Sequence, residues 1–296
     1  MLDQASLLRE VASQSSRYID DIQVPEHQPV AIAITSGKGG VGKTNVVANL
    51  AVSLAGLGKN VMILDADFGL ANVDLLFGIA PRHNLGDFVF GHTSLEDIVV
   101  EGPSGVKIIP ASSGIEQMTA LTREQQLRLI RGLSQLGAQT DYLLIDTAAG
   151  ISGNVIQFLL AAGVVIVVTA PEPTAIVDAY LVVKILAHRE SQKRVSILVN
   201  SVSGREEALS VFEQINAVSQ RFLSKPLEFF GFIERDIHVL QAVRQQAPCV
   251  TLFPGSVASR SINRLAKQLD QRCQVMRQQS DMSLSWNALF DQGNPS

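Results

Sequence analysis

From residue 30 onwards, short and almost continuous apolar runs alternate with longer amphipathic stretches. The runs lack the period-two alternation of a half-exposed strand, which indicates strands buried on both faces, as in a parallel sheet covered by helices. The predicted strands are residues 30–35, 61–64, 106–110, 142–146, 164–169, 195–199 and 227–233. The predicted helices include residues 45–56, 123–136, 174–188, 205–222 and 256–278. This alternation predicts an α/β fold, a doubly wound, mostly parallel sheet flanked by helices.

The first 29 residues have a different pattern. Leu2, Ala5 and Leu8 lie on one face of a short amphipathic helix, and Pro25 and Pro29 interrupt the segment that follows. We therefore expect residues 1–29 to form a small helix on a tether. Residues 30–280 form the main domain in this interpretation, and residues 281–296 form a C-terminal tail.

Composition narrows the class of protein. The chain has 296 residues, of which 46% are apolar and 18% charged, and its net charge is −4. A disordered chain is excluded, and a dedicated DNA-binding protein is disfavoured because phosphate contacts require clustered Lys and Arg. The longest apolar run, residues 158–168, is too short to span a membrane. The N-terminus does not resemble a signal peptide, and Cys249 and Cys273 match no metal-ligand spacing, so we expect a reduced, cytoplasmic protein.

A glycine-rich segment follows the first predicted strand. Residues 36–44 read SGKGGVGKT and contain the G-x-x-x-x-G-K-T pattern of a phosphate-binding loop. Glycines let successive backbone N–H groups face phosphate oxygens, and the helix that begins near Thr44 adds the positive end of its dipole. We expect Lys43 to contact the β- and γ-phosphates of a nucleotide and the Thr44 hydroxyl to bind Mg²⁺. The predicted nucleotide-binding residues of this segment are Gly37, Gly39, Gly40, Val41, Gly42, Lys43, Thr44 and Asn45.

Lys38 is not required by the loop itself. Its side chain cannot easily reach the phosphates held by its own loop, but it can reach a nucleotide held by a facing subunit. The alternative is a solvated loop lysine without a catalytic role.

Carboxylates end two further predicted strands. Asp65 and Asp67 are two positions apart on an extended segment, so both can face the phosphates. We expect Asp67 to orient the attacking water, and Asp65 to serve magnesium or to support the loop. Asp146 ends another apolar strand and is expected to bind magnesium through water, while Gly150 is a candidate sensor of the γ-phosphate. The alternative for each carboxylate is a turn or a helix cap.

Two weaker candidates also follow strand ends. Asn200 is a candidate for contact with the adenine edge, although a turn-forming asparagine is nearly as plausible. Glu172 is a candidate for contact with the ribose, and a favourable charge at a helix N-terminus is the simpler explanation.

In combination, these segments resemble the MinD/ParA (SIMIBI) ATPases, whose phosphate loop is a deviant Walker A motif. The resemblance extends through LDADFGLANVD at residues 64–74, DTAAG at 146–150 and EPTAIVDAY at 172–180. The combination is most similar to the FlhG (FleN) family, which limits the number of polar flagella. Residues 3–9, DQASLLR, match that family's N-terminal D-Q-A-x-x-L-R motif.

The resemblance implies a slow, Mg²⁺-dependent ATPase that forms an ATP-sandwiched homodimer. Lys38 would reach the partner's nucleotide, Asp67 would orient water, and Thr44, Asp65 and Asp146 would serve the metal. The resemblance also implies an FlhF-type GTPase and a σ54-type activator of flagellar genes as partners, with recruitment to the cell pole or the inner membrane surface. The residues expected to contact the GTPase are Asp3, Gln4, Ala5, Leu8 and Arg9.

The tail departs from the MinD pattern of a basic amphipathic helix. Leu284, Trp286, Leu289 and Phe290 can form a small apolar cluster, but no Lys or Arg follows Arg277. Because each basic residue near anionic lipid contributes about 1 kcal/mol, we expect weak or no direct membrane binding.

A ParA-type ATPase that partitions DNA or other cargo is the alternative function. It needs clustered basic residues, whereas those of the predicted helix 256–278 are interleaved with polar ones, and no direct contact with nucleic acid is expected. The iron–sulfur relatives of this fold would need suitably spaced cysteines, and a scaffold without turnover is disfavoured by Asp67.

Overall fold

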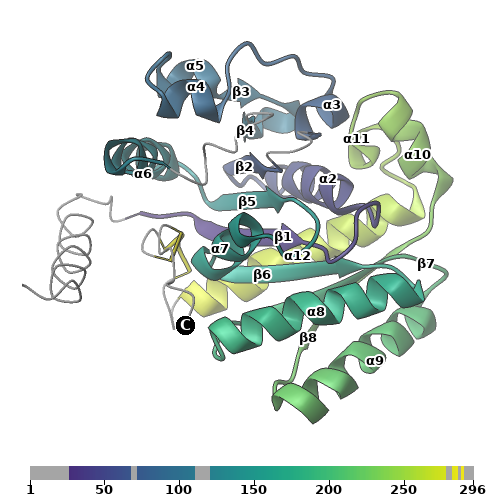
Figure 1. Ribbon diagram of the computed structural model, residues 1–296. Helices are drawn as coiled ribbons and strands as arrows, with labels where there is room; N and C mark the ends of the chain where they lie inside the picture. Colours follow the sequence, from purple (N-terminus) through teal and green to yellow (C-terminus); the bar gives the residue numbers. More distant parts are fainter. Residues whose placement is uncertain (1–26, 68–71, 111–120, 278–281, 286–287, 290–296) are drawn as a thin grey trace, which may run out of the picture.

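The computed structural model describes residues 27–67, 72–110, 121–277, 282–285 and 288–289. Within them, eight strands form one sheet in the order β3-β4-β2-β5-β1-β6-β7-β8 (Figure 1). The strands are β1 (Val30–Thr35), β2 (Val61–Ala66), β3 (Val100–Glu101), β4 (Lys107–Ile109), β5 (Tyr142–Thr147), β6 (Val164–Thr169), β7 (Val195–Val202) and β8 (Glu228–Glu234). Neighbouring strands are parallel except β3 and β4, which are antiparallel.

Helices cover both faces of the sheet, so the predicted doubly wound α/β fold is confirmed. One face packs against α4 (Leu85–Val89), α5 (Leu95–Ile98), α6 (Arg123–Gly137), α7 (Gly153–Ala161), α8 (Pro173–Arg189) and α9 (Arg205–Leu223). The other packs against α2 (Lys43–Ala55), α3 (Val73–Phe77), α11 (Cys249–Leu252) and α12 (Val257–Arg277). The remaining elements are η1 (Pro103–Gly105) and α10 (Ile237–Arg244).

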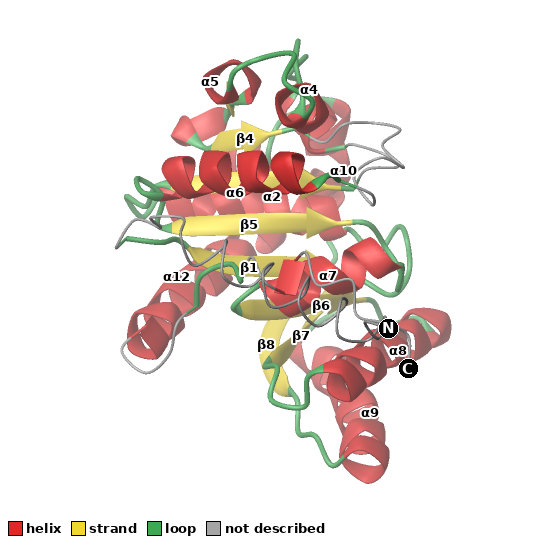
Figure 2. Ribbon diagram, turned by 60° about the vertical axis from the view of Figure 1, so that its left-hand side comes forward, coloured by secondary structure: helices red, strands yellow, loops and turns green. Residues whose placement is uncertain are grey.

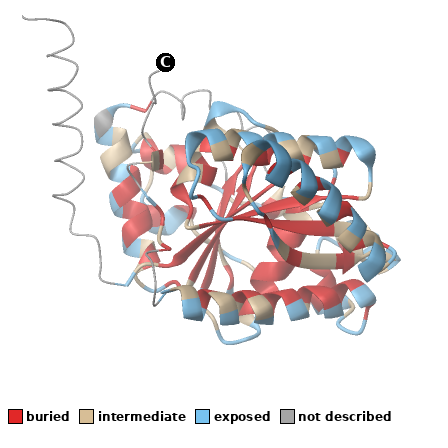
Figure 3. Ribbon diagram, turned by 90° about the horizontal axis from the view of Figure 1, so that it is seen from below, coloured by how far each residue is buried: buried red, intermediate tan, exposed pale blue. Residues whose placement is uncertain are grey.

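The central strands are buried along their whole length, as their continuous apolar runs predict. In β1, Ala31 and Ala33 belong to the hydrophobic cluster on one face, whereas Ile32 and Ile34 belong to the cluster on the other. Figure 3 shows most of the strands in the buried colour, with the exposed colour largely on outer surfaces of helices and on loops. The strands without period-two alternation are therefore those that have a hydrophobic cluster on each face.

The order of the strands reverses at β1: β2 and β5 lie on one side of it, and β6 to β8 lie on the other. The chain passes from β1 to β2 on one side and later from β5 to β6 on the other side. Figure 2 shows β4 and β5 pointing the same way, with a loop at the carboxyl end of β5. Ligands of doubly wound proteins bind at this carboxyl edge, where the strand order reverses.

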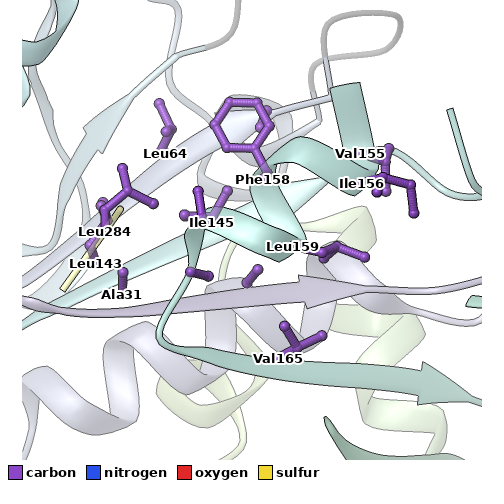
Figure 4. Packing of buried hydrophobic residues seen from close by; sticks show 14 of the residues in the cluster. Ala31, Leu64, Leu143, Ile145, Val155, Ile156, Phe158, Leu159, Val165 and Leu284 are labelled. Atoms are coloured by element: carbon purple, nitrogen blue, oxygen red, sulfur yellow. The ribbon is translucent and has the colours of Figure 1, made fainter. Parts of the chain in front are cut away.

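Residues 282–285 pack against the amino end of β1 and the carboxyl end of α7. The backbone N–H of Ala31 donates to the Met282 carbonyl oxygen at 2.9 Å, and that of Ser285 donates to the Ala161 carbonyl oxygen at 2.8 Å. Figure 4 shows Leu284 with Ala31 and other buried residues of the same face of the sheet. Leu284 and Leu289 are thus core residues here, whereas the sequence suggests an apolar cluster on a separate tail.

Some sequence predictions concern residues outside the described part of the chain. These are Asp3, Gln4, Ala5, Leu8 and Arg9 of the N-terminal motif, together with Trp286 and Phe290 of the tail. In the described part, no helix combines the length and apolar character needed to cross a membrane.

Candidate nucleotide-binding site

The loop between β1 and α2 has the backbone conformation of a phosphate cradle. Gly40 and Gly42 have φ angles of 81° and 88°, in the left-handed region that favours glycine. A Cβ atom added to Gly39 or Gly40 would have no neighbour within 4 Å, so space is open beside the backbone. Gly42 precedes the first turn of α2, whose N–H groups carry the positive end of the helix dipole. This geometry fits the phosphates of a nucleotide.

Asn200, at the carboxyl end of β7, holds the end of this loop. Its side-chain amide donates a hydrogen bond to the Val41 carbonyl oxygen at 2.8 Å. A Cβ atom at Gly42 would lie 2.5 Å from the same amide nitrogen, so a glycine is required for two reasons. The structure therefore gives Asn200 a role in supporting the loop, and its contact with adenine stays a prediction.

Lys43 and Asp146 form a buried ion pair below the loop. The Lys43 Nζ lies 2.5 Å from the Asp146 Oδ1, and the two side chains are 8% and 1% exposed. Burial raises the pKa of the Asp146 carboxyl, whereas Lys43 and a hydrogen bond from the Thr44 side chain oppose that rise. The structure thus brings together the predicted phosphate lysine and two predicted metal-site residues.

Asp65 lies beside Asp146, because the two residues are paired in the register of β2 and β5. One Asp65 oxygen accepts a hydrogen bond from the backbone N–H of Asp67 at 3.0 Å. The other accepts from the backbone N–H groups of Asn72 at 3.3 Å and Val73 at 3.4 Å. These bonds support the loop after β2, which is one of the two roles that the sequence suggests. A direct role in metal binding stays a prediction.

The electrostatic environment of Asp65 favours its protonated form. Burial, followed by the nearby Asp146 carboxylate, raises the pKa of Asp65 to about 7, although its backbone donors act in the opposite direction. Asp67 also contributes to raising the pKa of Asp146. The three carboxyl groups therefore influence one another electrostatically, although the described residues include no group of three or more His, Cys, Asp or Glu side chains arranged to hold a metal ion. The water-orienting role of Asp67 itself stays a prediction.

Gly150 connects the loop after β5 to the phosphate loop. Its φ is 97°, in the left-handed region, and its backbone N–H donates to the Ser36 carbonyl oxygen at 2.8 Å. The amide proposed to sense the γ-phosphate is thus hydrogen-bonded to the start of the phosphate loop. This hydrogen bond joins the loop after β5 to the phosphate loop.

Lys38 and Glu172, both predicted site residues, contact each other within one chain. The Lys38 Nζ lies 2.6 Å from the Glu172 Oε2 and 3.0 Å from the Thr174 Oγ1. Gly37 packs against α8, where a Cβ atom would overlap the Asp178 backbone. Thr174 and Asp178 were not predicted as site residues. Their signal is their place in the segment EPTAIVD, which begins the helix after β6.

Comparison with known proteins agrees with this geometry. Residues 32–249 match the family model described as the CobQ/CobB/MinD/ParA nucleotide binding domain. The antiactivator FleN of Pseudomonas aeruginosa is 42% identical over 244 residues, which cover 82% of this chain and 87% of FleN. The flagellum site-determining protein YlxH of Helicobacter pylori is 35% identical over 236 residues, which cover 79% of this chain and 80% of YlxH.

A solved structure extends the similarity to the fold. The septum site-determining protein MinD of Pyrococcus horikoshii, determined as a complex with Mg-ADP, aligns with a TM-score of 0.68 at 25% identity. The alignment covers 83% of this chain and 97% of that one. The chain therefore belongs to the CobQ/CobB/MinD/ParA family of nucleotide-binding domains, as a MinD-like ATPase of the FlhG/FleN group.

Proposed function

We propose that this chain is a slow, ATP-dependent dimerising ATPase that regulates the number of flagella. The observation that carries the proposal is the buried Lys43–Asp146 pair below an open glycine loop. It occurs in a chain that is 42% identical to a protein described as an antiactivator. A second relative is described as a flagellum site-determining protein, which supports a flagellar output.

The phosphate loop binds the triphosphate in this mechanism. Backbone N–H groups from Gly39 to Thr44 surround the phosphates, and Lys43 transfers its ammonium contact from Asp146 to the β- and γ-phosphates. Asp146, released from that pair, and the Thr44 hydroxyl are then available to hold magnesium. A bound Mg²⁺ ion supplies positive charge that neutralises the oxygens of the transferred phosphoryl group.

Asp67 orients the water that attacks the γ-phosphate. Asp65 supports this function from below, because it accepts a hydrogen bond from the Asp67 backbone and two more from the start of α3. A water-orienting side chain acts through its position, and a support whose carboxylate is only 1% exposed limits the movement of the loop. Asp65 is therefore a positioning residue for Asp67.

Dimerisation places Lys38 of each subunit at the nucleotide of the other. Hydrolysis then removes the γ-phosphate that joins the subunits, and Gly150 transmits this loss to the phosphate loop through its bond to Ser36. The partner proteins bind the dimeric form. In this proposal they are an FlhF-type GTPase, contacted through residues 3–9, and a σ54-type activator of flagellar genes.

The C-terminal segment makes strong membrane recruitment unfavourable. Leu284 and Leu289 are already buried in the core, so insertion into a lipid surface would require their removal. The alternative of DNA partitioning also finds little support on α12. Arg264, Arg272 and Arg277 lie over the aromatic rings of Phe232, Phe230 and Tyr142, respectively. These contacts favour packing of the guanidinium groups on their own subunit.

The rate at which the protein releases phosphate from ATP in the presence of Mg²⁺ tests the proposed catalysis. Asp67→Ala is expected to reduce turnover by at least about 100-fold, the usual effect of losing a group that assists proton transfer or positions water, while ATP binding persists. Glu213→Ala, which removes an exposed carboxylate from α9, is the matched control and keeps wild-type turnover. Wild-type turnover in Asp67→Ala would contradict the assignment.

A further inference from the structure

The ammonium group of Lys38 is held by its own subunit at the start of α8. It lies 2.6 Å from the Glu172 Oε2 and 3.0 Å from the Thr174 Oγ1. The side chains of Lys38 and Glu172 are 38% and 58% exposed. We call these three residues the Lys38 clasp. The clasp holds the Lys38 ammonium group, which in the proposed dimer would contact the nucleotide of the other subunit.

One contact brings the backbone beside Lys38 close to α8, and a second fixes the turn that carries Lys38. Gly37 packs against the Asp178 backbone in the second turn of α8, so closely that any side chain is excluded. The Ser36 hydroxyl donates to the Lys38 carbonyl oxygen at 2.9 Å. The parallel pairing of β1 with β6 brings the loops after both strands together. The clasp is therefore a consequence of sheet order as well as of a single ion pair.

Glu172 is the member on which the clasp depends. It is the N-cap residue of α8, and its side chain makes no capping hydrogen bond to that helix, so the carboxylate is available to Lys38. The amino end of a helix is positive and repels a lysine. Without the carboxylate, Thr174 alone would hold the ammonium group against that repulsion, and Lys38 would occupy this position less often.

We propose that Glu172 and Thr174 are positioning residues that retain Lys38 within its own subunit before dimerisation. Each subunit exchanges this clasp for the nucleotide of the other subunit when the dimer forms. The proposal rests on the proposed function, because it assigns a resting position to the lysine that dimerisation uses. An exposed ion pair shifts an equilibrium by at most about fivefold, so the clasp weakens dimerisation modestly without preventing it.

Two variants of the full chain test the exchange. Glu172→Gln and Thr174→Val are titrated with a non-hydrolysable ATP analogue and Mg²⁺, and the fraction of dimer is measured by light scattering. Glu172→Gln is expected to dimerise at an analogue concentration about two- to fivefold lower than wild type, and Thr174→Val at a concentration lowered by a smaller factor. Glu213→Gln, an exposed carboxylate of α9, is the matched control and keeps the wild-type midpoint.

A second measurement tests the accessibility of the Lys38 ammonium group in the nucleotide-free protein, without dimerisation. Acetic anhydride labels lysines of the nucleotide-free protein, and mass spectrometry gives the rate at Lys38. Glu172→Gln is expected to increase that rate about two- to fivefold, with exposed Lys184 of α8 as the internal control.

A contact of Glu172 with the ribose would instead raise the analogue concentration at which Glu172→Gln dimerises, and that result would overturn the exchange. An unchanged labelling rate would overturn the clasp. A wild type that stays monomeric at saturating analogue would refute the proposed function, and labelling would still decide whether the clasp exists.

Discussion

Truncation of Leu284 to alanine tests whether the C-terminal segment is part of the folded core. Leu284 is 6% exposed and belongs to the hydrophobic cluster that contains Ala31 and Leu143. Leu→Ala changes in cores cost about 2–5 kcal/mol, as a sum of lost burial and a residual cavity. Because Leu284 lies in a segment without regular secondary structure, its backbone can relax around the cavity, and we expect the lower part of this range, about 2–3 kcal/mol.

The assay is chemical denaturation of the nucleotide-free protein, followed by circular dichroism. Leu284→Ala is expected to lower the midpoint at an unchanged m-value, which identifies a loss of stability rather than a change in the surface exposed on unfolding. In a thermal scan, the same loss corresponds to roughly 4–12 °C for a chain of this size. Leu75→Ala is the matched control, because Leu75 is 55% exposed on α3 and its truncation should cost less than about 0.5 kcal/mol.

A second variant reaches the same contact from the opposite side. A Cβ atom at Gly163 would overlap the Met282 backbone, so Gly163→Ala must displace the C-terminal segment. If Leu284→Ala and Gly163→Ala are both as stable as Leu75→Ala, the segment does not pack on the sheet in solution. In that case its leucines are free for other contacts, including insertion into a lipid surface.

The remaining predictions concern the buried carboxylates. Asp146→Asn leaves Lys43 as an uncompensated buried charge, so the free energy of unfolding should fall by about 3–5 kcal/mol in denaturant titrations; a loss below about 1 kcal/mol would contradict the buried pair. Asp65 has a folded-state pKa of about 7, above its ordinary 3.8, so the folded protein binds this proton more tightly than the unfolded chain between these values. This contribution to stability is complete below about pH 4 and is lost as the pH rises to about 7. Without Mg²⁺, the wild type should therefore lose about 2–3 kcal/mol between pH 5 and pH 7.5, and Asp65→Asn should lose less; equal losses would refute the assigned pKa.

The central strands and the phosphate loop could be predicted because their signals are local. Strands buried on both faces have uninterrupted apolar runs, and the loop's glycines precede a lysine and a threonine. One run is composite, however, since residues 158–168 contain the end of α7 as well as most of β6. The edge strand β3 has two residues, Val100 and Glu101, which is too short for any periodic pattern. Short α4 has a capping box between Asn84 and Asp87, a local signal that identifies it in retrospect.

Contacts between distant segments could not be read from local patterns. Leu284 and Leu289 look like a surface cluster because their partners are far away in the chain. The hydrogen bonds of Met282 and Ser285 and the close approach of Gly163 to Met282 show how the segment packs. The contact between Lys38 and Glu172 differs, because it follows from the order of the strands. The two residues are 134 positions apart, but they follow adjacent strands, so the sheet order alone places their loops together.

The most direct test of the account is the mass of the particle in solution. Size-exclusion chromatography with light scattering should give a monomer of 31.9 kDa without nucleotide and twice that mass with a non-hydrolysable ATP analogue and Mg²⁺. Lys38→Ala should bind the analogue and remain a monomer. A wild type of unchanged mass at saturating analogue, or a Lys38→Ala variant that dimerises as readily as wild type, would contradict the claim that two copies of this chain close around ATP.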